Sequence, residues 1–197
     1  MISHRQSSRF AAEPSIEPAR AAGLDRLATA VRAAVSKRAD WRETARLVAS
    51  ELERHLPSPS ILAPDKRAGD PETYRSHVLH SEPDGMFSIV ALVWRPGQVT
   101  RIHDHVTWCV FGVIQGIEYE ELFTLDEESG CLLEAGNSVN VVGDVSGFAP
   151  PGDIHRVRNA GDRTAISIHI YGTDVTRIGS SIRRDYDLPV RPARSAA

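Results

Sequence analysis

Residues 97–116 read GQVTRIHDHVTWCVFGVIQG, and residues 150–159 read PPGDIHRVRN. The first stretch carries two histidines one residue apart, within a segment rich in Val, Ile and aromatic residues that is typical of a β-strand. Because alternate residues of a strand point to the same side, His103 and His105 share one face and Asp104 takes the other. An H-x-H pair on a strand can chelate one metal ion, but a lone pair is also common as two ordinary polar residues.

The residues around this pair follow a fixed spacing. The first stretch runs G-x5-H-x-H-x3-C-x6-G from Gly97 to Gly116, and the second runs P-x-G-x2-H-x3-N from Pro150 to Asn159. These two patterns resemble the two motifs of the cupin superfamily. Two motifs in register over roughly sixty residues are far more specific than H-x-H alone.

The resemblance implies a fold and a ligand set. The fold is mainly β, a cupin double-stranded β-helix (jelly-roll) barrel, and the implied metal ligands are His103, His105 and His155. The chain departs from the motifs at two positions. Cys109 stands where cupins usually have Glu, and Gly143 lies one residue away from the position of a motif glycine.

The rest of the chain predicts helices followed by a barrel. Asp40 and Glu43 form a capping-box pattern at the start of a helix, and apolar residues recur there at helical spacing. Farther on, clusters of Gly, Pro and Asp separate short runs rich in Val and Ile, as in a β-sandwich or barrel. We predict strands at 75–79, 87–94, 100–105, 109–115, 117–125, 138–142, 155–159 and 165–171. We expect a flexible tail at 1–18, N-terminal helices packing on the barrel at 19–56, the barrel at 57–186 and a C-terminal tail at 187–197.

Composition excludes several classes of protein. The 197 residues carry a formal net charge of −3, which argues against a nucleic-acid or anionic-membrane partner. Two cysteines do not make a disulfide scaffold. The chain starts without an apolar signal region and has no apolar run long enough to span a membrane, so we expect a cytoplasmic protein with reduced thiols.

The predicted strand 165–171 has two unlike faces. Isoleucine occupies every second position, and Ser167, His169 and Tyr171 occupy the others. A polar face of this kind lies either inside a barrel, where it needs hydrogen-bond partners, or on an outer surface in water.

A cupin with Cys in place of Glu and three histidines resembles the cysteine dioxygenase family of thiol dioxygenases, bacterial type, over residues 72–186. The resemblance favours the inner position for Ser167, His169 and Tyr171, as a relay whose Tyr hydroxyl points at an iron site. It implies Fe(II) as cofactor, and a small thiol and O2 as partners, with the thiol oxidised to a sulfinic acid. Without a carboxylate ligand, the site keeps the positive charge of the metal and favours an anionic thiolate.

Cys109 has two alternative roles. Free Cys is usually a small buried apolar residue. In animal members of the family, however, the matching Cys is joined by a thioether to the Tyr of the relay strand, whereas many bacterial members have Gly there. A Cys109–Tyr171 crosslink therefore remains open.

A carboxylate on the substrate would call for a cationic partner, preferably Arg. The resemblance places this partner on the strand that contains Arg75 and His77, or downstream of the relay strand at Arg177, Arg183 or Arg184. Each of these residues is otherwise an ordinary surface side chain. Cysteine, 3-mercaptopropionate and a larger mercapto-acid such as mercaptosuccinate all remain as substrates, and the sequence leaves the oligomeric state open.

Two other functions compete with this one. The first is a non-catalytic metal-binding or sensor cupin, and the second is another cupin enzyme, such as a carbon–carbon cleaving dioxygenase or an isomerase. The polar strand and Cys109 favour a thiol dioxygenase, because a plain binding cupin needs no relay facing three histidines.

Overall fold

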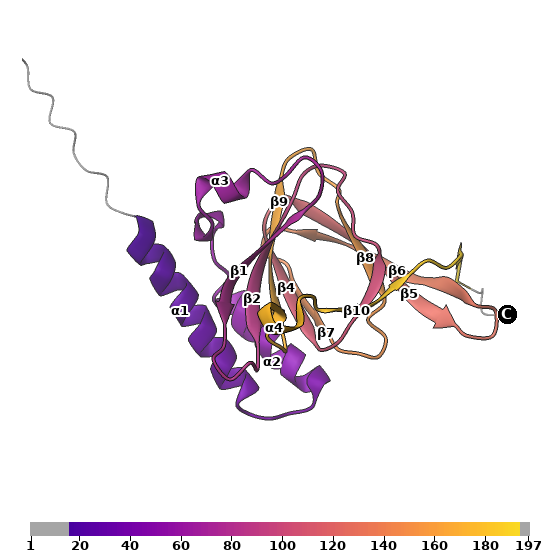
Figure 1. Ribbon diagram of the computed structural model, residues 1–197, viewed down its shortest axis with the longest axis horizontal. Coiled ribbons are helices and arrows are strands. Elements are labelled where there is room, and N and C mark those ends of the chain that lie inside the picture. The colour runs from indigo at the N-terminus through magenta and orange to yellow at the C-terminus, as the bar shows by residue number, and fades with distance from the viewer. Residues whose placement is uncertain (1–15, 194–197) are drawn as a thin grey trace, which may run out of the picture.

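A computed structural model describes residues 16–193, in which helices precede a β-rich region (Figure 1). The helical elements are α1 (Ile16–Val35), α2 (Trp41–Arg54), the 3-10 turn η1 (Pro59–Ile61), α3 (Pro64–Arg67) and, between two late strands, α4 (Val175–Ile178). The strands are β1 (Arg75–Ser81), β2 (Ser88–Trp94), β3 (Ile102–His105), β4 (Cys109–Gln115), β5 (Ile117–Asp126), β6 (Cys131–Val141), β7 (Val145–Phe148), β8 (His155–Asn159), β9 (Ala165–Tyr171), β10 (Ile182–Tyr186) and β11 (Val190–Arg191).

The strands form two sheets that enclose a cavity. One sheet has the order β1-β2-β9-β4-β7, and the other has the order β10-β3-β8-β5-β6-β11. Side chains of β1, β2 and β9 line the cavity together with side chains of β3 and β8 from the second sheet. The curled sheets and the helices confirm the predicted cupin barrel with N-terminal α-helices.

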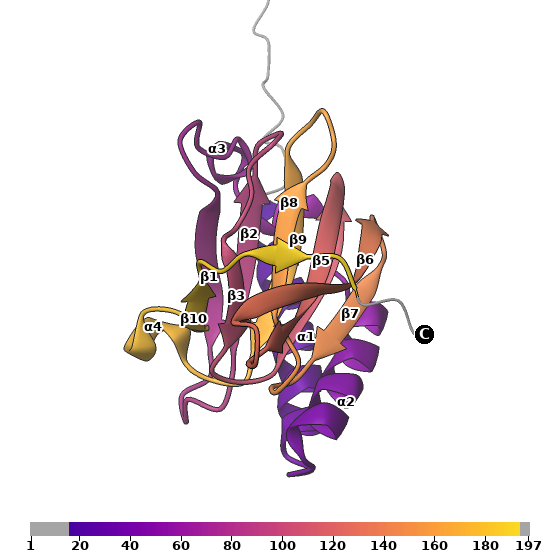
Figure 2. The same ribbon diagram turned by 90° about the vertical axis from the view of Figure 1, so that its right-hand side faces the viewer.

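Helices α1 and α2 cover the outer face of the five-stranded sheet. In Figure 1 they lie alongside β1, β2 and β4, and in Figure 2 they lie behind the strands. Leu27 and Val31 of α1 and Val48 and Leu52 of α2 are buried in one core with the outer side chains of the sheet. Burying each of these side chains stabilises the fold by roughly 1.5–3 kcal/mol. None of the helices within residues 16–193 has the length and apolar character needed to cross a membrane.

Two local features fix α2 against the sheet. The Asp40 side chain caps the helix by accepting a hydrogen bond from the backbone N of Glu43 at 2.9 Å. The Glu43 side chain pairs with Arg46 instead of returning to the cap, so half of the predicted capping box is present. On β4, a Cβ at Gly112 would lie 2.7 Å from the Leu56 side chain, so this glycine permits the close approach of the helical layer.

Strand β9 is buried on both faces. Its outward side chains are Ile166, Ile168 and Ile170, and its inward side chains are Ser167, His169 and Tyr171. The isoleucines pack in the core shared with α1 and α2, whereas the polar side chains face the interior of the barrel. The alternative of a polar face in water is thereby excluded.

Several predicted boundaries are wrong, and each error has a physical reason. Helix α1 starts within the predicted tail 1–18, whose first 15 residues lie outside the described part of the chain. The predicted strand 138–142 is only the end of β6, because the earlier residues have low β-propensity and are held by pairing with β5. The short strands β7, β10 and β11 were not predicted, and β11 lies in the predicted C-terminal tail. Strands β7 and β11 have four and two residues, and β10 has three consecutive charged residues, so none shows a clear alternation of polar and apolar residues.

Candidate metal centre

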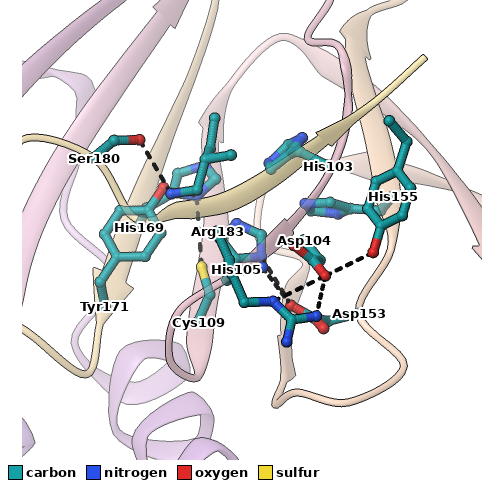
Figure 3. Close-up of polar contacts among 12 residues, drawn as sticks. His103, Asp104, His105, Cys109, Asp153, His155, His169, Tyr171, Ser180 and Arg183 are labelled. Atoms are coloured by element: carbon teal, nitrogen blue, oxygen red, sulfur yellow. Dashed lines mark hydrogen bonds and ion pairs between the residues drawn. The ribbon is translucent and has the colours of Figure 1, made fainter.

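Three histidines from two adjacent strands meet on one wall of the cavity. Strand β3 supplies His103 and His105, and β8 supplies His155, which pairs directly with His103 in the sheet register. One ring nitrogen from each histidine lies within 4.8 Å of the others. All three rings are buried, and Figure 3 shows them gathered together.

Each ring is held by its Nδ1 atom. The acceptors are the backbone oxygen of Arg101 for His103 (3.0 Å), the Asp153 carboxyl group for His105 (3.2 Å) and the Glu120 carboxyl group for His155 (2.6 Å). A carbonyl or carboxylate oxygen only accepts hydrogen bonds, so Nδ1 carries the hydrogen in each ring. The Nε2 lone pairs are therefore left for another partner.

Burial disfavours the charged form of two of these rings. Burial, reinforced by the neighbouring histidines, lowers the pKa of His103 to about 3, and burial also lowers the pKa of His105. The Nε2 atom of His155 is buried without a hydrogen-bond partner among residues 16–193. Three buried imidazoles, one of them with an unpartnered nitrogen, fit a divalent transition metal. Imidazole suits Zn, Cu, Fe or Ni, and three protein ligands leave coordination positions open.

Acidic side chains lie behind the histidines. Burial would raise the pKa of Asp153, but hydrogen bonds from the side chain and backbone of His105 hold it below its usual range. This anion offsets part of the charge of a bound cation. Because Asp153 bonds to His105 and is not one of the three grouped ligands, the predicted ligand set without a carboxylate is unchanged.

The histidines open onto a cavity of about 290 Å³. Tyr171 and His169 also line it, from β9. Its other polar lining residues are Tyr74, Ser76, Thr100, Ser180 and Ser181, and its apolar ones include Val90, Leu92, Trp94 and Val157. Within residues 16–193, the lining contains neither Arg nor Lys.

The polar side chains of β9 form a continuous chain of contacts. The Ser167 hydroxyl lies 3.0 Å from Nε2 of His169, and the Tyr171 hydroxyl lies 3.4 Å from Nδ1 of the same ring. Burial lowers the pKa of His169 to about 3 and raises the pKa of Tyr171 well above its usual value. Both groups are therefore neutral, and the Tyr171 hydroxyl is a hydrogen-bond donor at the cavity.

Cys109 lies next to this chain. It pairs directly with Tyr171 across β4 and β9, and its Sγ atom lies 3.9 Å from Nδ1 of His169, as the dashed line in Figure 3 marks. Burial raises the pKa of the thiol well above its usual value. This position is compatible with either role expected for Cys109.

Arg75 and His77 do not reach the cavity, which corrects the prediction that one of them binds substrate. Both occupy the opposite face of β1, because the residues that line the cavity are Tyr74, Ser76 and Val78. Arg75 is exposed and pairs with Asp70. Strand β1 does line the cavity, but with the side chains of the other face.

The arginines downstream of β9 also have other partners. Arg177 is exposed and its Nε lies 3.1 Å from the Asp174 carboxylate. Arg184 is exposed, with its guanidinium 5.1 Å from the centre of the Tyr186 ring. Neither side chain lines the cavity, so the structure does not support substrate binding by Arg177.

Arg183 binds the residue between the two β3 histidines. Its guanidinium pairs with the Asp104 carboxylate, to which the Tyr186 hydroxyl also donates at 2.8 Å (Figure 3). Asp104 is fully buried and faces away from the histidines, as strand alternation predicts. Arg183 thus holds β10 against β3 and points away from the cavity, which corrects its predicted role in substrate binding.

Sequence reasoning missed the acidic groups behind the histidines. Asp153 lies two residues before His155 in the second motif, and Glu120 lies on β5 with the inward parity of Glu118. Two glutamates on the same face of one predicted strand, Glu118 and Glu120, would have been a usable sequence signal. The register that brings β5 beside β8 is visible only in three dimensions.

Comparison with solved structures gives several similarities of low identity. A recombinant oxalate oxidase in complex with glycolate is 16% identical, with a TM-score of 0.43 and coverage of 54% of each chain. An uncharacterised conserved protein with a double-stranded β-helix domain from Klebsiella pneumoniae is 17% identical (TM-score 0.44), covering 58% of this chain and 90% of that one. A Cupin 2 conserved barrel domain protein from Salinispora arenicola is 20% identical (TM-score 0.39), covering 54% and 80%. The present chain spans about half the length of the oxalate oxidase.

A family model described as "Cysteine dioxygenase type I" matches residues 68–180. The matched segment begins before β1 and ends after α4. It contains the three histidines, Cys109 and the polar face of β9, and it spans more than half of the chain.

Proposed function

Because the chain belongs to the cysteine dioxygenase type I family, we propose that it is a thiol dioxygenase that uses iron(II) and O2 to convert a small thiol into its sulfinic acid. Both atoms of O2 join the sulfur atom, which loses four electrons, and the hydrogen of the thiol becomes the acidic proton of the product. The observation that carries the proposal is the set of three buried histidines facing a cavity that Tyr171 also lines.

His103, His105 and His155 would hold the iron through their Nε2 atoms. Bound iron supplies the redox chemistry with O2 and stabilises the thiolate form of a substrate thiol. Asp153 and Glu120 keep the hydrogen on Nδ1 of their histidines, and so keep each Nε2 lone pair directed at the ion.

Tyr171 is the proposed catalytic donor. Its hydroxyl stays protonated because burial raises its pKa, so it can donate a hydrogen bond to the substrate or to oxygen. His169 orients this hydroxyl, and Ser167 holds the His169 ring from the other side. Burial also excludes bulk water from the polar chain, which strengthens each hydrogen bond.

The substrate class remains a proposal. The family favours a carboxylate-bearing thiol such as cysteine or 3-mercaptopropionate. The described lining offers the hydroxyl groups of Ser76, Ser180 and Ser181 where an arginine was expected. Comparing cysteine and 3-mercaptopropionate with cysteamine, which lacks the carboxylate, and with mercaptosuccinate, which has two carboxylates, separates these possibilities.

We also propose a cytoplasmic location, with the thiol and O2 as the partners. Cys109 and Cys131 are both free, which suits a reducing compartment. Cys131 is the buried first residue of β6, and no function is assigned to it.

The proposal is tested with protein loaded anaerobically with Fe(II). We expect O2 uptake that depends on a thiol, with one sulfinic acid formed per O2 consumed, measured with an oxygen electrode and by mass spectrometry. His155→Gln should abolish this uptake, whereas His55→Gln, at the end of α2 and away from the cavity, should retain it.

Other outcomes identify the competing functions. Tight iron binding without O2 uptake for any thiol would contradict the proposal and indicate a metal-binding or sensor cupin. O2 uptake with a substrate that contains no thiol would indicate another cupin oxygenase, and turnover without O2 would indicate an isomerase.

A further inference from the structure

Glu118 is a buried acidic residue that the proposed mechanism does not use. Its side chain is 0% exposed. The Ser167 hydroxyl and the Trp94 indole lie near its carboxyl group, but neither makes a well-formed hydrogen bond to either carboxyl oxygen. Burial raises its pKa to about 7, an effect that the Ser167 hydroxyl and the Trp94 indole partly oppose and the charge of Glu120 reinforces. A buried, unsatisfied carboxyl group is costly to the fold, so its position calls for an explanation.

The surroundings of Glu118 leave one polar route from its pocket to Tyr171. The side chains next to it are Asn140 across β6, Asn159 across β8, Trp94 on β2, Ser167 on β9 and Glu120 on its own strand. Of these, only Glu120 is ionisable, and it is committed to His155. The two asparagines are uncharged. Glu120 leads on to His155, whereas Ser167 leads on to His169 and then to Tyr171.

Ser167 can connect Glu118 with the cavity. Its Oγ atom accepts a hydrogen bond from Nε1 of Trp94 at 3.4 Å and lies 3.0 Å from Nε2 of His169. The neutral His169 ring has one donor nitrogen and one acceptor nitrogen, and its Nδ1 atom faces the Tyr171 hydroxyl. Each group between the two ends can therefore donate in either direction.

The charge at the buried end determines which direction is satisfied. When the nearby Glu118 and Ser167 side chains close into a hydrogen bond, a protonated Glu118 donates to Ser167, whose hydroxyl then donates to Nε2 of His169. Nδ1–H of that ring donates to Tyr171, and the Tyr171 hydroxyl has its own hydrogen free for the cavity. An ionised Glu118 instead accepts from Ser167, so Nε2–H donates to Ser167 and the Tyr171 hydroxyl turns back to donate to Nδ1.

We propose that Glu118 is the positioning residue at the buried end of the Ser167–His169–Tyr171 chain, and that its protonation decides whether Tyr171 donates a hydrogen bond into the cavity. The direction of the chain is a property of this protein's own side chains. Only the catalytic consequence, that ionisation of Glu118 lowers activity, rests on the proposed function.

The direct test follows the tautomer of His169 by NMR. The full-length protein is labelled with ¹⁵N-histidine and loaded with Zn(II), a redox-silent ion that keeps the three ligand histidines from titrating. His169→Gln assigns the resonance. As the pH rises from about 5 to about 9, we expect the hydrogen of His169 to move from Nδ1 to Nε2 with a midpoint near the Glu118 pKa of about 7.

Glu118→Gln keeps the size of the side chain and removes the titration. We expect a single His169 tautomer at every pH in this variant, whereas Glu134→Gln, an exposed change on β6, should titrate as the wild type does. An unchanging tautomer in the wild type, or the same shift in Glu118→Gln, would overturn the proposal.

A second readout does not depend on assigning the histidine. The folded state holds the Glu118 proton more tightly than the unfolded chain does, so the free energy of unfolding should fall from about pH 4.5 to about pH 7 and level off above. Glu118→Gln should lose this part of the decline. Identical pH profiles for the two proteins would contradict the role assigned to Glu118.

Activity measurements then separate the two hypotheses. At about pH 8, roughly one tenth of Glu118 remains protonated, so kcat/KM for thiol oxidation should be roughly tenfold higher in Glu118→Gln than in the wild type, with similar values at low pH. Equal alkaline declines in both proteins would contradict control by Glu118. If no thiol is oxidised by any variant, the proposed function fails, while the tautomer measurement still decides the direction of the chain.

Discussion

The two walls of the cavity hold their polar side chains in different ways. On the metal wall, which we define as His103, His105 and His155, each ring donates to an oxygen atom that can only accept. On the relay wall, which we define as Ser167, His169 and Tyr171, each group contacts another that can both donate and accept. The metal wall therefore has one hydrogen-bonding arrangement, and the relay wall has two.

This difference matches what each wall has to do. A metal ligand must present the same lone pair at all times, so a fixed tautomer is an advantage. A group that transfers or redirects hydrogen bonds during a reaction needs a second arrangement close in free energy. Carboxyl groups are used on both sides: Asp153 and Glu120 fix the metal wall, and Glu118 biases the relay wall.

The largest effect is expected from breaking the metal wall. His155→Gln removes a ligand whose Nε2 atom has no other partner among the described residues. We expect the bound iron to be lost and activity to fall by more than about 100-fold, beyond the range typical for residues that support a ligand. Metal analysis and O2 uptake measure both effects.

A variant with unchanged iron content would contradict the assignment of His155 as a ligand. His55→Gln makes the same chemical change at the end of α2 and should leave iron content and activity unchanged.

Weakening the contact between Asp153 and the metal ligand His105 should have a smaller effect. Asp153→Asn keeps the shape but removes the anion that fixes His105, so iron affinity should fall by roughly 10–100-fold. Competition with a chelator measures the affinity. Asp162→Asn, in an exposed turn, is the matched control, and an equal effect in both variants would show that the loss does not come from His105.

The relay wall should affect turnover rather than metal binding. Tyr171→Phe removes one hydrogen bond, worth about 1.4 kcal/mol at most, so kcat should fall by up to about tenfold with iron content unchanged. Tyr119→Phe changes a ring that lies under Arg158 instead of in the cavity, and it should have no such effect. Loss of iron in Tyr171→Phe would place Tyr171 on the metal wall.

The smallest expected effect is a change in mass if Tyr171 of the relay wall is covalently bonded to Cys109. In a Cys109–Tyr171 thioether, Sγ bonds to a ring carbon while O2 takes up two electrons and two protons. Protein isolated after turnover is then expected to be lighter by two hydrogen atoms in intact-mass measurements, and Cys109→Ser should not change mass. The unmodified mass at every stage would leave Cys109 as a buried apolar side chain.

Most of the fold could be predicted from local patterns. The isoleucines of β9 and the apolar stripe of α2 follow the periods of a strand and a helix, and these elements form where expected. The first half of β6 could not be predicted, because Glu134-Ala135-Gly136-Asn137 has no strand preference of its own. Pairing with β5 supplies the hydrogen bonds there, and such pairing is set by tertiary structure.

The candidate site was predictable only where motif spacing carries the information. The gathering of His103, His105 and His155 agrees with the two sequence motifs. The side chains of β1 and its preceding residue that face the cavity are Ser76 and Tyr74 instead of Arg75 and His77. A one-residue shift reverses the faces of a strand, and the alternating pattern of β1 is too weak to fix it.

The position of β3 in the sheet, where Asp104 pairs with Arg183 of β10, has a consequence for the order in which the protein folds during synthesis. Strand β3 carries two of the three histidines, yet its neighbours in the sheet, β8 and β10, follow it much later in the chain. During translation, β3 leaves the ribosome before either neighbour exists. The metal site therefore forms late. His103 and His105 can hold an ion in its final geometry only after β8, which carries His155, and β10 have been made and have paired with β3.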